Sequence, residues 1–245
     1  MTVKVKVAFD GTDFCGSQVQ KDRRTVFGEF QKGLTTVVSD ADNIKACSRL
    51  DSGVHAKCFY FSFTTEKQLD LHKLPLSLNA NLPMDIRVIE ATEAEVDFHA
   101  RYSAKGKEYT YYIKNNHIDD PFTSKYYYRY PQKLDVDAMH QAAQYFVGTH
   151  DFRSFMARWS KIIDCHRTVY SAQVTQHDDM IIFKVCADGY LYNMVRIMVG
   201  TLIEVGKGTI ETEALPDIIS ACDRSAAGPT APPQGLFLTK VFYDL

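Results

Sequence analysis

Residues 48–63, SRLDSGVHAKCFYFSF, join a polar turn to a run of alternating aromatic side chains. Every second residue of this run shares one face, which is the period of a half-buried β-strand. The side chains on its apolar face are Phe59, Phe61 and Phe63. The stretch therefore predicts a strand with one face against a core, and a turn around Asp51 that leads into it.

The chain on either side of this strand predicts a complete small domain. Residues 3–9 alternate like a strand and end at the turn signal Asp10-Gly11. Residues 26–37 have apolar side chains near helical spacing. The other elements predicted for this half are an N-cap at Thr25, a short helix with a proline within 71–83 and a strand at 86–94. The order strand, helix, strand, strand, helix, strand is that of split βαβ, ferredoxin-like domains.

The second half of the chain begins after a junction at residues 98–107. Strand-like and helix-like patterns mix there without a tandem repeat, which predicts an α+β fold of two related halves. The most apolar helix, residues 190–206, carries Arg196 off its apolar stripe. The other elements predicted for this half are a strand at 107–115, a helix at 134–148, two strands within 166–189, a short helix near 211–222 and a strand at 236–245.

Composition narrows the class of protein. The 245 residues are 45% hydrophobic and 24% charged, as in globular proteins of one large or two modest domains. No apolar run is long enough to span a bilayer, and the N-terminus lacks the apolar core of a secretion signal. Six cysteines without a C-x-x-C pair predict reduced thiols and a cytoplasmic location. A net charge of −2 argues against indiscriminate coating of nucleic acid, but it allows a local basic surface.

The sequence lacks the common motifs for nucleotides, cofactors and metals. No P-loop, G-x-G-x-x-G, G-x-S-x-G or H-E-x-x-H occurs, which argues against triphosphate, redox, serine-hydrolase and zinc-protease chemistry. The pair Cys165-His166 has no second pair at metal-ligand spacing. We therefore expect no metal and no cofactor.

Asp51 has two interpretations from its residue type alone. An aspartate before Ser-Gly commonly caps a turn by accepting a backbone N–H two residues on. Alternatively, it acts as a nucleophile or base, if a nearby cation keeps it ionised. Arg49 qualifies because residues 49 and 51 share a side of an extended backbone. Arg196 qualifies because burying it without an anion is costly, and the alternative for it is a side chain that extends along the apolar helix to the surface. Tyr109, on a predicted strand, either packs in the core or stacks on a base.

Several segments match one family in order. FDGTDFCGSQ (9–18) is similar to Y-D-G-x-x-x-x-G-W-Q, SRLDSGVHA (48–56) to G-R-T-D-x-G-V-H-A and NANLPMDIRV (79–88) to N-x-x-L-P-x-D-I. FHARYSAKGKEYTYYI (98–113) is similar to F-x-A-R-x-x-A-x-x-x-x-Y-x-Y, and later blocks follow in the same order. Over nearly its whole length the chain resembles the TruA family of tRNA pseudouridine synthases.

The resemblance implies an isomerase that converts uridine to pseudouridine at positions 38–40 of the tRNA anticodon arm. It implies no cofactor, no metal, and a homodimer. The fold that it implies has two RRM-like halves, whose mixed, mainly antiparallel central sheet is flanked by helices and carries a catalytic cleft. We expect the halves at residues 1–103, with the catalytic aspartate, and 104–245, with the active-site tyrosine and arginine.

The resemblance also assigns roles to single residues. Asp51 matches the catalytic aspartate, Arg196 the arginine that pairs with it, and Tyr109 the tyrosine that stacks on the target base and is a candidate for proton transfer. Arg49 matches the arginine linked to flipping and holding the nucleotide, and His55 is a candidate for RNA contact. Basic side chains that are candidates for phosphate contact are Lys21, Arg23, Arg24, Lys105, Lys107, Arg158 and Lys161. Whether the aspartate attacks the sugar or the base, or removes a sugar proton, stays open.

Two departures from the family pattern matter for the proposed site. Leu50 stands in place of the signature threonine, and Ser17 in place of a tryptophan. Both departures put the choice of uridine and full activity in question, although the proposed chemical groups are intact. An RRM-like RNA-binding paralogue with reduced or altered catalysis is therefore the alternative. A third reading, a small-molecule enzyme with Asp51 as base, predicts no salt-dependent affinity for tRNA.

Overall fold

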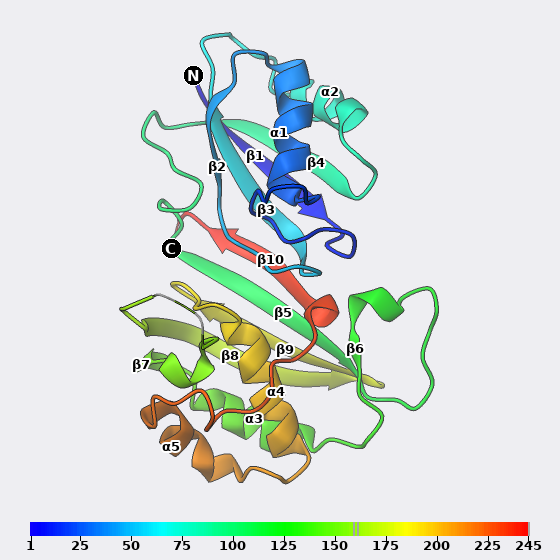
Figure 1. Ribbon diagram of the computed structural model, residues 1–245, viewed down its shortest axis with the longest axis vertical. Helices are drawn as coiled ribbons and strands as arrows, with labels where there is room; N and C mark the ends of the chain where they lie inside the picture. Colours follow the sequence, from blue (N-terminus) through cyan, green and yellow to red (C-terminus); the bar gives the residue numbers. More distant parts are fainter. Residues whose placement is uncertain (159, 161, 245) are drawn as a thin grey trace. The chain divides into compact units, whose positions relative to one another are not determined.

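The chain folds into two compact units of mixed strands and helices (Figure 1). The computed structural model describes residues 1–158, 160 and 162–244. The first unit consists of residues 1–105 together with the chain from residue 237, and the second of residues 106–236. The boundary lies inside the junction predicted at residues 98–107, while the last strand groups with the first unit.

The sheet of the first unit is built around its long central strand, β3. β1 pairs antiparallel with one edge of β3, and β4 pairs antiparallel with β1. The other edge of β3 pairs antiparallel with β2 near one end and parallel with β10 near the other. The strands are β1 Thr2–Phe9, β2 Asp42–Ala46, β3 His55–Thr64, β4 Ile86–Ala94 and β10 Leu236–Phe242. The alternating phenylalanines of β3 are buried, as their period predicts.

Two helices cover the first unit's sheet. They are α1, Val26–Val37, and α2, Leu74–Asn81, and the order β1-α1-β2-β3-α2-β4 confirms the split βαβ prediction. Thr25 is the N-cap of α1, and its side chain accepts a hydrogen bond from the N–H of Gly28 (3.3 Å). Phe30 of α1 stacks on Phe61 of β3 with ring centroids 3.9 Å apart, which ties the helix to the sheet.

The second unit repeats the α+β composition with a different set of pairings. β9 lies between β5 and β8, antiparallel to both, and β7 pairs antiparallel with β8. A short strand, β6, pairs parallel with β5. The strands are β5 Gly106–Lys114, β6 Tyr128–Arg129, β7 Gly148–Asp151, β8 His166–His177 and β9 Met180–Ala187. The pairings in both units confirm the predicted α+β class with mixed, mainly antiparallel sheet structure.

The helices of the second unit are α3 Val136–Gln144, α4 Met194–Gly206 and α5 Leu215–Ser220, and short 3-10 turns lie at Ser124–Tyr126, Arg153–Phe155, Thr212–Ala214 and Pro233–Gly235. α4 is buried on nearly all sides, which explains why it is the most apolar helix of the sequence. None of the helices in the described part of the chain is long and apolar enough to cross a membrane.

Three local features differ from the sequence prediction. α4 begins at Met194 rather than near residue 190, because Asn193 has a left-handed backbone (φ 62°) that a helix cannot continue through. α3 ends four residues before Gly148, in i to i+3 bonds such as that from the Phe146 N–H to the Ala143 carbonyl (3.2 Å). The short strands β6 and β7 were not predicted, because two and four residues are too few to show a period.

Candidate active site

Asp51 lies in the connection between β2 and β3, residues 47–54, which we term the aspartate loop. A second loop, residues 11–17, runs against it and is termed the facing loop. The Ser52 hydroxyl and the Gly53 N–H both donate to the Phe14 carbonyl, at 3.0 and 3.4 Å. The Ser17 N–H donates to the Leu50 carbonyl (3.0 Å). Hydrogen bonds on both sides of residue 51 therefore fix the position of the Asp51 backbone.

Two glycines of the facing loop allow this close approach. A Cβ on Gly11 would lie 2.0 Å from the Val54 carbonyl oxygen, a contact that no side chain permits. Gly16 has φ +81°, and a Cβ there would lie 2.7 Å from the Leu50 carbonyl oxygen. The D-G and G-S-Q elements of the first matched segment thus serve the packing of two loops on one another.

Arg49 and Asp51 occupy different depths of the aspartate loop. The Asp51 side chain is half-buried, whereas Arg49 is exposed to solvent. The Asp51 carbonyl accepts the Val54 N–H (3.2 Å), so a backbone bond closes the turn. An exposed arginine two residues from a partly shielded carboxylate is compatible with contact to a large polyanionic substrate.

His55 is fully buried at the start of β3. Its Nδ1 accepts the Gly11 N–H (2.9 Å) and lies 3.2 Å from an Asp10 carboxylate oxygen, and its ring stacks on Phe237 at 4.6 Å. These contacts join β3 to the facing loop. Direct contact of His55 with substrate stays a prediction.

Arg24 makes a strong contact within the first unit. Its guanidinium forms two parallel bonds with Asp85 (2.7 and 2.8 Å) and lies 4.1 Å above the Phe14 ring. The hydrogen bond with Asp85 raises the pKa of Arg24 above its usual value. Arg24 therefore supports the facing loop through its contact with the Phe14 ring, and its contact with substrate stays a prediction.

The remaining basic candidates differ in exposure. Lys107 is half-buried, and Lys161 lies outside the described residues. The candidates whose side chains are exposed are Lys21, Arg23, Lys105 and Arg158. Exposure satisfies one requirement for phosphate contact, and their roles stay predictions.

Tyr109 belongs to β5 in the second unit and is 5% exposed. Its ring packs edge-to-face on Tyr190, with centroids 4.8 Å apart and planes at 80°. Tyr190 is itself held by hydrogen bonds from its hydroxyl to the carbonyls of Lys107 (2.9 Å) and Val185 (3.0 Å). Burial raises the pKa of Tyr190 well above its usual value, so it remains a neutral phenol. Sequence patterns did not single out Tyr190, because a tyrosine in an apolar helix start looks like core.

Arg196 lies in the first turn of α4 and is half-buried. Its Nε donates to the Ala231 carbonyl (2.7 Å), and its Nη1 donates to the Asn193 side-chain oxygen (3.0 Å). Its own carbonyl accepts the Ala231 N–H (3.0 Å). Because two atoms of the planar guanidinium are bonded to fixed partners, the direction of the plane is set before any ligand binds.

The loop that supplies Ala231, residues 228–232, is packed directly on α4 and is termed the proline loop. A Cβ on Gly200 would lie 1.7 Å from the Pro229 carbonyl oxygen, so the loop lies on the bare backbone of the helix. The Thr201 hydroxyl accepts the Gly228 N–H (2.9 Å) and donates to the Ile197 carbonyl (2.8 Å). The proline loop thus holds Arg196 through contacts that the sequence pattern alone did not reveal.

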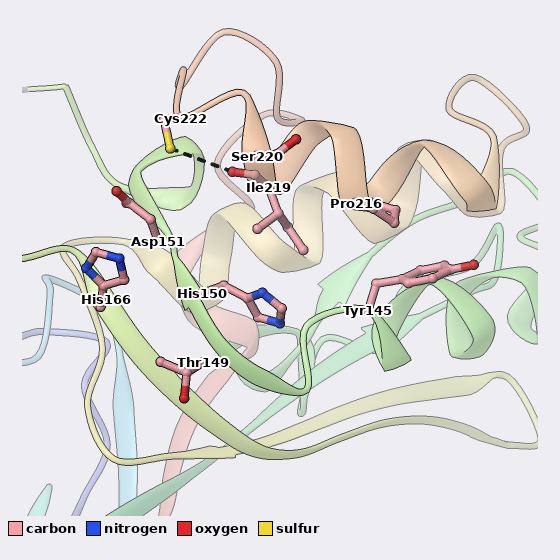
Figure 2. A pocket seen from close by; sticks show the side chains of 9 residues that line it. All are labelled: Tyr145, Thr149, His150, Asp151, His166, Pro216, Ile219, Ser220 and Cys222. Atoms are coloured by element: carbon pink, nitrogen blue, oxygen red, sulfur yellow. Dashed lines mark hydrogen bonds between the residues drawn. The ribbon is translucent and has the colours of Figure 1, made fainter.

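The second unit also has a surface cavity of about 410 Å³, which Figure 2 shows. It is lined by Tyr145, Thr149, His150, Asp151, His166, Pro216, Ile219, Ser220 and Cys222, and none of the predicted site residues is among them. The Cys222 thiol contacts the Ile219 carbonyl at 4.0 Å, and burial raises its pKa, so it remains a protonated thiol. Among residues 1–158, 160 and 162–244, no three His, Cys, Asp or Glu side chains group as metal ligands.

Comparison with known proteins gives one consistent result. The family model described as tRNA pseudouridine synthase matches residues 6–103 and 142–244. The tRNA pseudouridine synthase A of Moorella thermoacetica is 45% identical over 243 residues, which span 98% of this chain and 99% of the relative. That of a Geobacillus species is 43% identical over 99% of this chain and 98% of the relative, and that of Bacillus pumilus 42% identical over the full length of both.

Proposed function

Since the chain belongs to the tRNA pseudouridine synthase family, we propose that it isomerises uridine to pseudouridine in tRNA, at positions 38–40 of the anticodon arm. The observation that carries the proposal is the signature around Asp51, which keeps Arg49, Asp51 and the G-V-H-A segment, in a loop whose backbone is bonded on both sides of the aspartate. The relatives' shared name and their full-length similarity support the same reaction.

The reaction needs no redox step and no external energy. The C1′–N1 bond breaks, the uracil turns, and a C1′–C5 bond forms, while C5 loses a proton and N1 gains one. The base must first leave the stack, which costs a few kcal/mol. An enzyme for this reaction therefore needs a charged group at the sugar and base, an aromatic surface for the extruded uracil, and cations for the phosphates.

The candidate residues match these needs by chemical type. We assign Asp51 as the catalytic carboxylate and Arg196 as the cation that keeps it ionised. Tyr109 offers a ring that its edge-to-face contact with Tyr190 holds in place, and it is the candidate to stack on the uracil. Exposed Arg49 is the candidate to hold the flipped nucleotide.

The organisation of the enzyme is part of the proposal. We propose that residues 1–103 and 104–245 are its two functional halves, the first with Asp51 and the second with Tyr109 and Arg196. The family resemblance supports a homodimer, and a tRNA substrate together with six free cysteines supports a cytoplasmic location.

Replacing Asp51 by alanine tests the catalytic assignment directly. We expect Asp51→Ala to lower pseudouridine formation in a tRNA transcript by at least about a thousandfold, because no other group replaces a catalytic carboxylate. Affinity for tRNA should persist and should fall with rising salt. The matched control is Asp13→Asn, which removes an exposed carboxylate from the facing loop and should leave the rate unchanged.

Each other outcome selects a different function. Full turnover by Asp51→Ala refutes the catalytic assignment. Wild-type protein that binds tRNA but forms no pseudouridine in any tRNA species favours the RRM-like RNA-binding paralogue. Wild-type protein whose tRNA affinity does not depend on salt favours a small-molecule enzyme.

A further inference from the structure

Two residues that depart from the family pattern, Ser17 and Leu50, are bonded to each other. The Leu50 N–H donates to the Ser17 hydroxyl oxygen (2.7 Å), and the Ser17 N–H donates to the Leu50 carbonyl (3.0 Å). The Ser17 hydroxyl in turn donates to the Ser48 carbonyl in a longer bond of 3.5 Å. Both residues are buried, with 2% and 7% of their surface exposed.

This pair of bonds fixes the two peptide planes that flank Leu50. The Leu50 N–H belongs to the planar peptide group that starts at Arg49, and the Leu50 carbonyl belongs to the group that leads to Asp51. A single residue of the facing loop therefore holds both planes. Their orientations set the directions in which Arg49 and Asp51 leave the backbone.

Ser17 is itself joined to regular structure. Its carbonyl accepts the Phe27 N–H (3.0 Å) and the neighbouring Gly16 carbonyl accepts the Val26 N–H (3.2 Å), both in the first turn of α1. These two N–H groups belong to the helix N-terminus and have no partner within the helix. The aspartate loop is thus connected through Ser17 to α1, which is packed on β3.

The bond to the Leu50 N–H depends on a side chain that can accept. A serine hydroxyl accepts and donates, whereas the indole of the family's tryptophan only donates. An alanine at this position would leave the buried Leu50 N–H without its acceptor, and the loop would move to find one. This chain therefore secures its aspartate loop by a bond that the family's usual residue cannot make.

We propose that Ser17 is a positioning residue of the isomerase, whose hydroxyl sets the direction of Asp51 and Arg49. The inference rests on the proposed function, because it takes Asp51 as the catalytic carboxylate. Ser17 is 2% exposed and acts through Asp51 and Arg49, so its loss lowers the rate of the chemical step by a larger factor than the affinity for tRNA. Small displacements of a reacting group cost large factors in rate, up to about a hundredfold for 1 Å.

The test compares Ser17→Ala with the loss of another buried serine hydroxyl in the first unit. Ser62 lies near the end of β3 that is farther from Asp51, and it is also 2% exposed. Its hydroxyl accepts the Ala100 N–H (3.2 Å). We expect Ser17→Ala to lower the single-turnover rate on a tRNA transcript about tenfold and to raise the Kd for tRNA by a smaller factor. Both Ser17→Ala and Ser62→Ala should lower Tm, each by about 2–6 °C. Ser62→Ala should keep the wild-type rate.

Ser17→Thr keeps the hydroxyl and should recover most of the rate that Ser17→Ala loses. A second measurement needs no variant: amide exchange of the Leu50 N–H in wild-type protein should be slow, because the bond to Ser17 protects it. Rapid exchange of this amide overturns the proposal even if Ser17→Ala fails to fold.

The remaining outcomes distinguish failure of the Ser17 proposal from failure of the proposed function on which it rests. A wild-type rate in Ser17→Ala, or equal rate losses in Ser17→Ala and Ser62→Ala, refutes positioning by Ser17. If Asp51→Ala is inactive in the same assay, the proposed function survives that result. If Asp51→Ala is active, the catalytic assignment itself is wrong, whatever the Ser17 variants do.

Discussion

In the first unit Asp51 is carried by a loop, whereas in the second unit Arg196 is carried by the first turn of α4. The loop has no hydrogen-bond ladder of its own, and it obtains its shape from bonds to the facing loop. The helix supplies its own backbone bonds, and the proline loop needs only to orient the side chain of Arg196.

The two regions nevertheless use the same chemical means. In each, one buried hydroxyl accepts a loop N–H: Ser17 from Leu50, and Thr201 from Gly228. In each, a glycine permits a backbone contact that a Cβ would block, at Gly16 and Gly200. The difference is in what the contact supports, because only in the loop do these bonds determine the backbone of the chemical residue itself.

The largest expected effect is on α4. Gly200→Ala places a Cβ 1.7 Å from the Pro229 carbonyl oxygen, so the proline loop must leave the helix. We expect a loss of about 3 kcal/mol or more in the free energy of unfolding, measured by urea denaturation. As a control, Gly28→Ala in α1 meets only the Thr25 hydroxyl at 3.0 Å and should change stability by less than about 1 kcal/mol. A folded, wild-type-like Gly200→Ala protein would show that the contact is not tight.

The next effect concerns the aspartate loop. Gly16→Ala combines a left-handed backbone (φ +81°) with a contact of 2.7 Å to the Leu50 carbonyl oxygen. Gly208→Ala has the same kind of strain (φ +73°) but nothing within 4 Å. Gly208→Ala should lose about 1–2 kcal/mol of stability, and Gly16→Ala more because of the added clash, measured by urea denaturation. Only Gly16→Ala should lower the rate of pseudouridine formation, because only its new Cβ displaces the peptide next to Asp51.

Equal rates in these two glycine variants would mean that the aspartate loop tolerates displacement. The backbone bonds of the aspartate loop would then not affect the rate, and the difference between the loop and the helix would not matter for function.

Among the substitutions expected to lower the rate, Thr201→Val should have the smallest effect. This change removes the acceptor of the Gly228 N–H at almost constant side-chain volume. We expect a stability loss of about 1–3 kcal/mol from thermal unfolding. The rate should fall less than in Ser17→Ala, because Arg196 keeps its bond to the Ala231 carbonyl and its helical backbone. A rate loss equal to that of Ser17→Ala would contradict this ranking of loop and helix.

Periodicity predicted the longer elements because a repeated pattern averages over local exceptions. β1, α1, β3 and β4 lie close to their predicted ranges, and so do the paired strands β8 and β9. Boundaries failed where one residue's backbone decided them, as at Asn193 before α4. β6 and β7 were not predicted, because strands of two and four residues are too short to show a hydrophobic period.

For the candidate site, residue types predicted which groups carry chemistry, and the structure added what holds them. Arg24 was predicted from its charge as a phosphate contact, and the structure shows it bonded to Asp85. Tyr190 was not predicted, because its packing against Tyr109 joins strand β5 to the connection between β9 and α4 across 81 residues of sequence and leaves no local signal.

The sequence by itself determined the α+β class, the main elements and the family, because hydrophobic period and ordered motifs are local properties of the chain. Only the tertiary structure decided that Ser17 and Leu50 bond to each other and that the proline loop rests on α4. These contacts join residues 27 to 33 positions apart, and each has a backbone group on at least one side, which every residue type carries. Only folding brings these groups together, so no sequence pattern predicts that they are in contact.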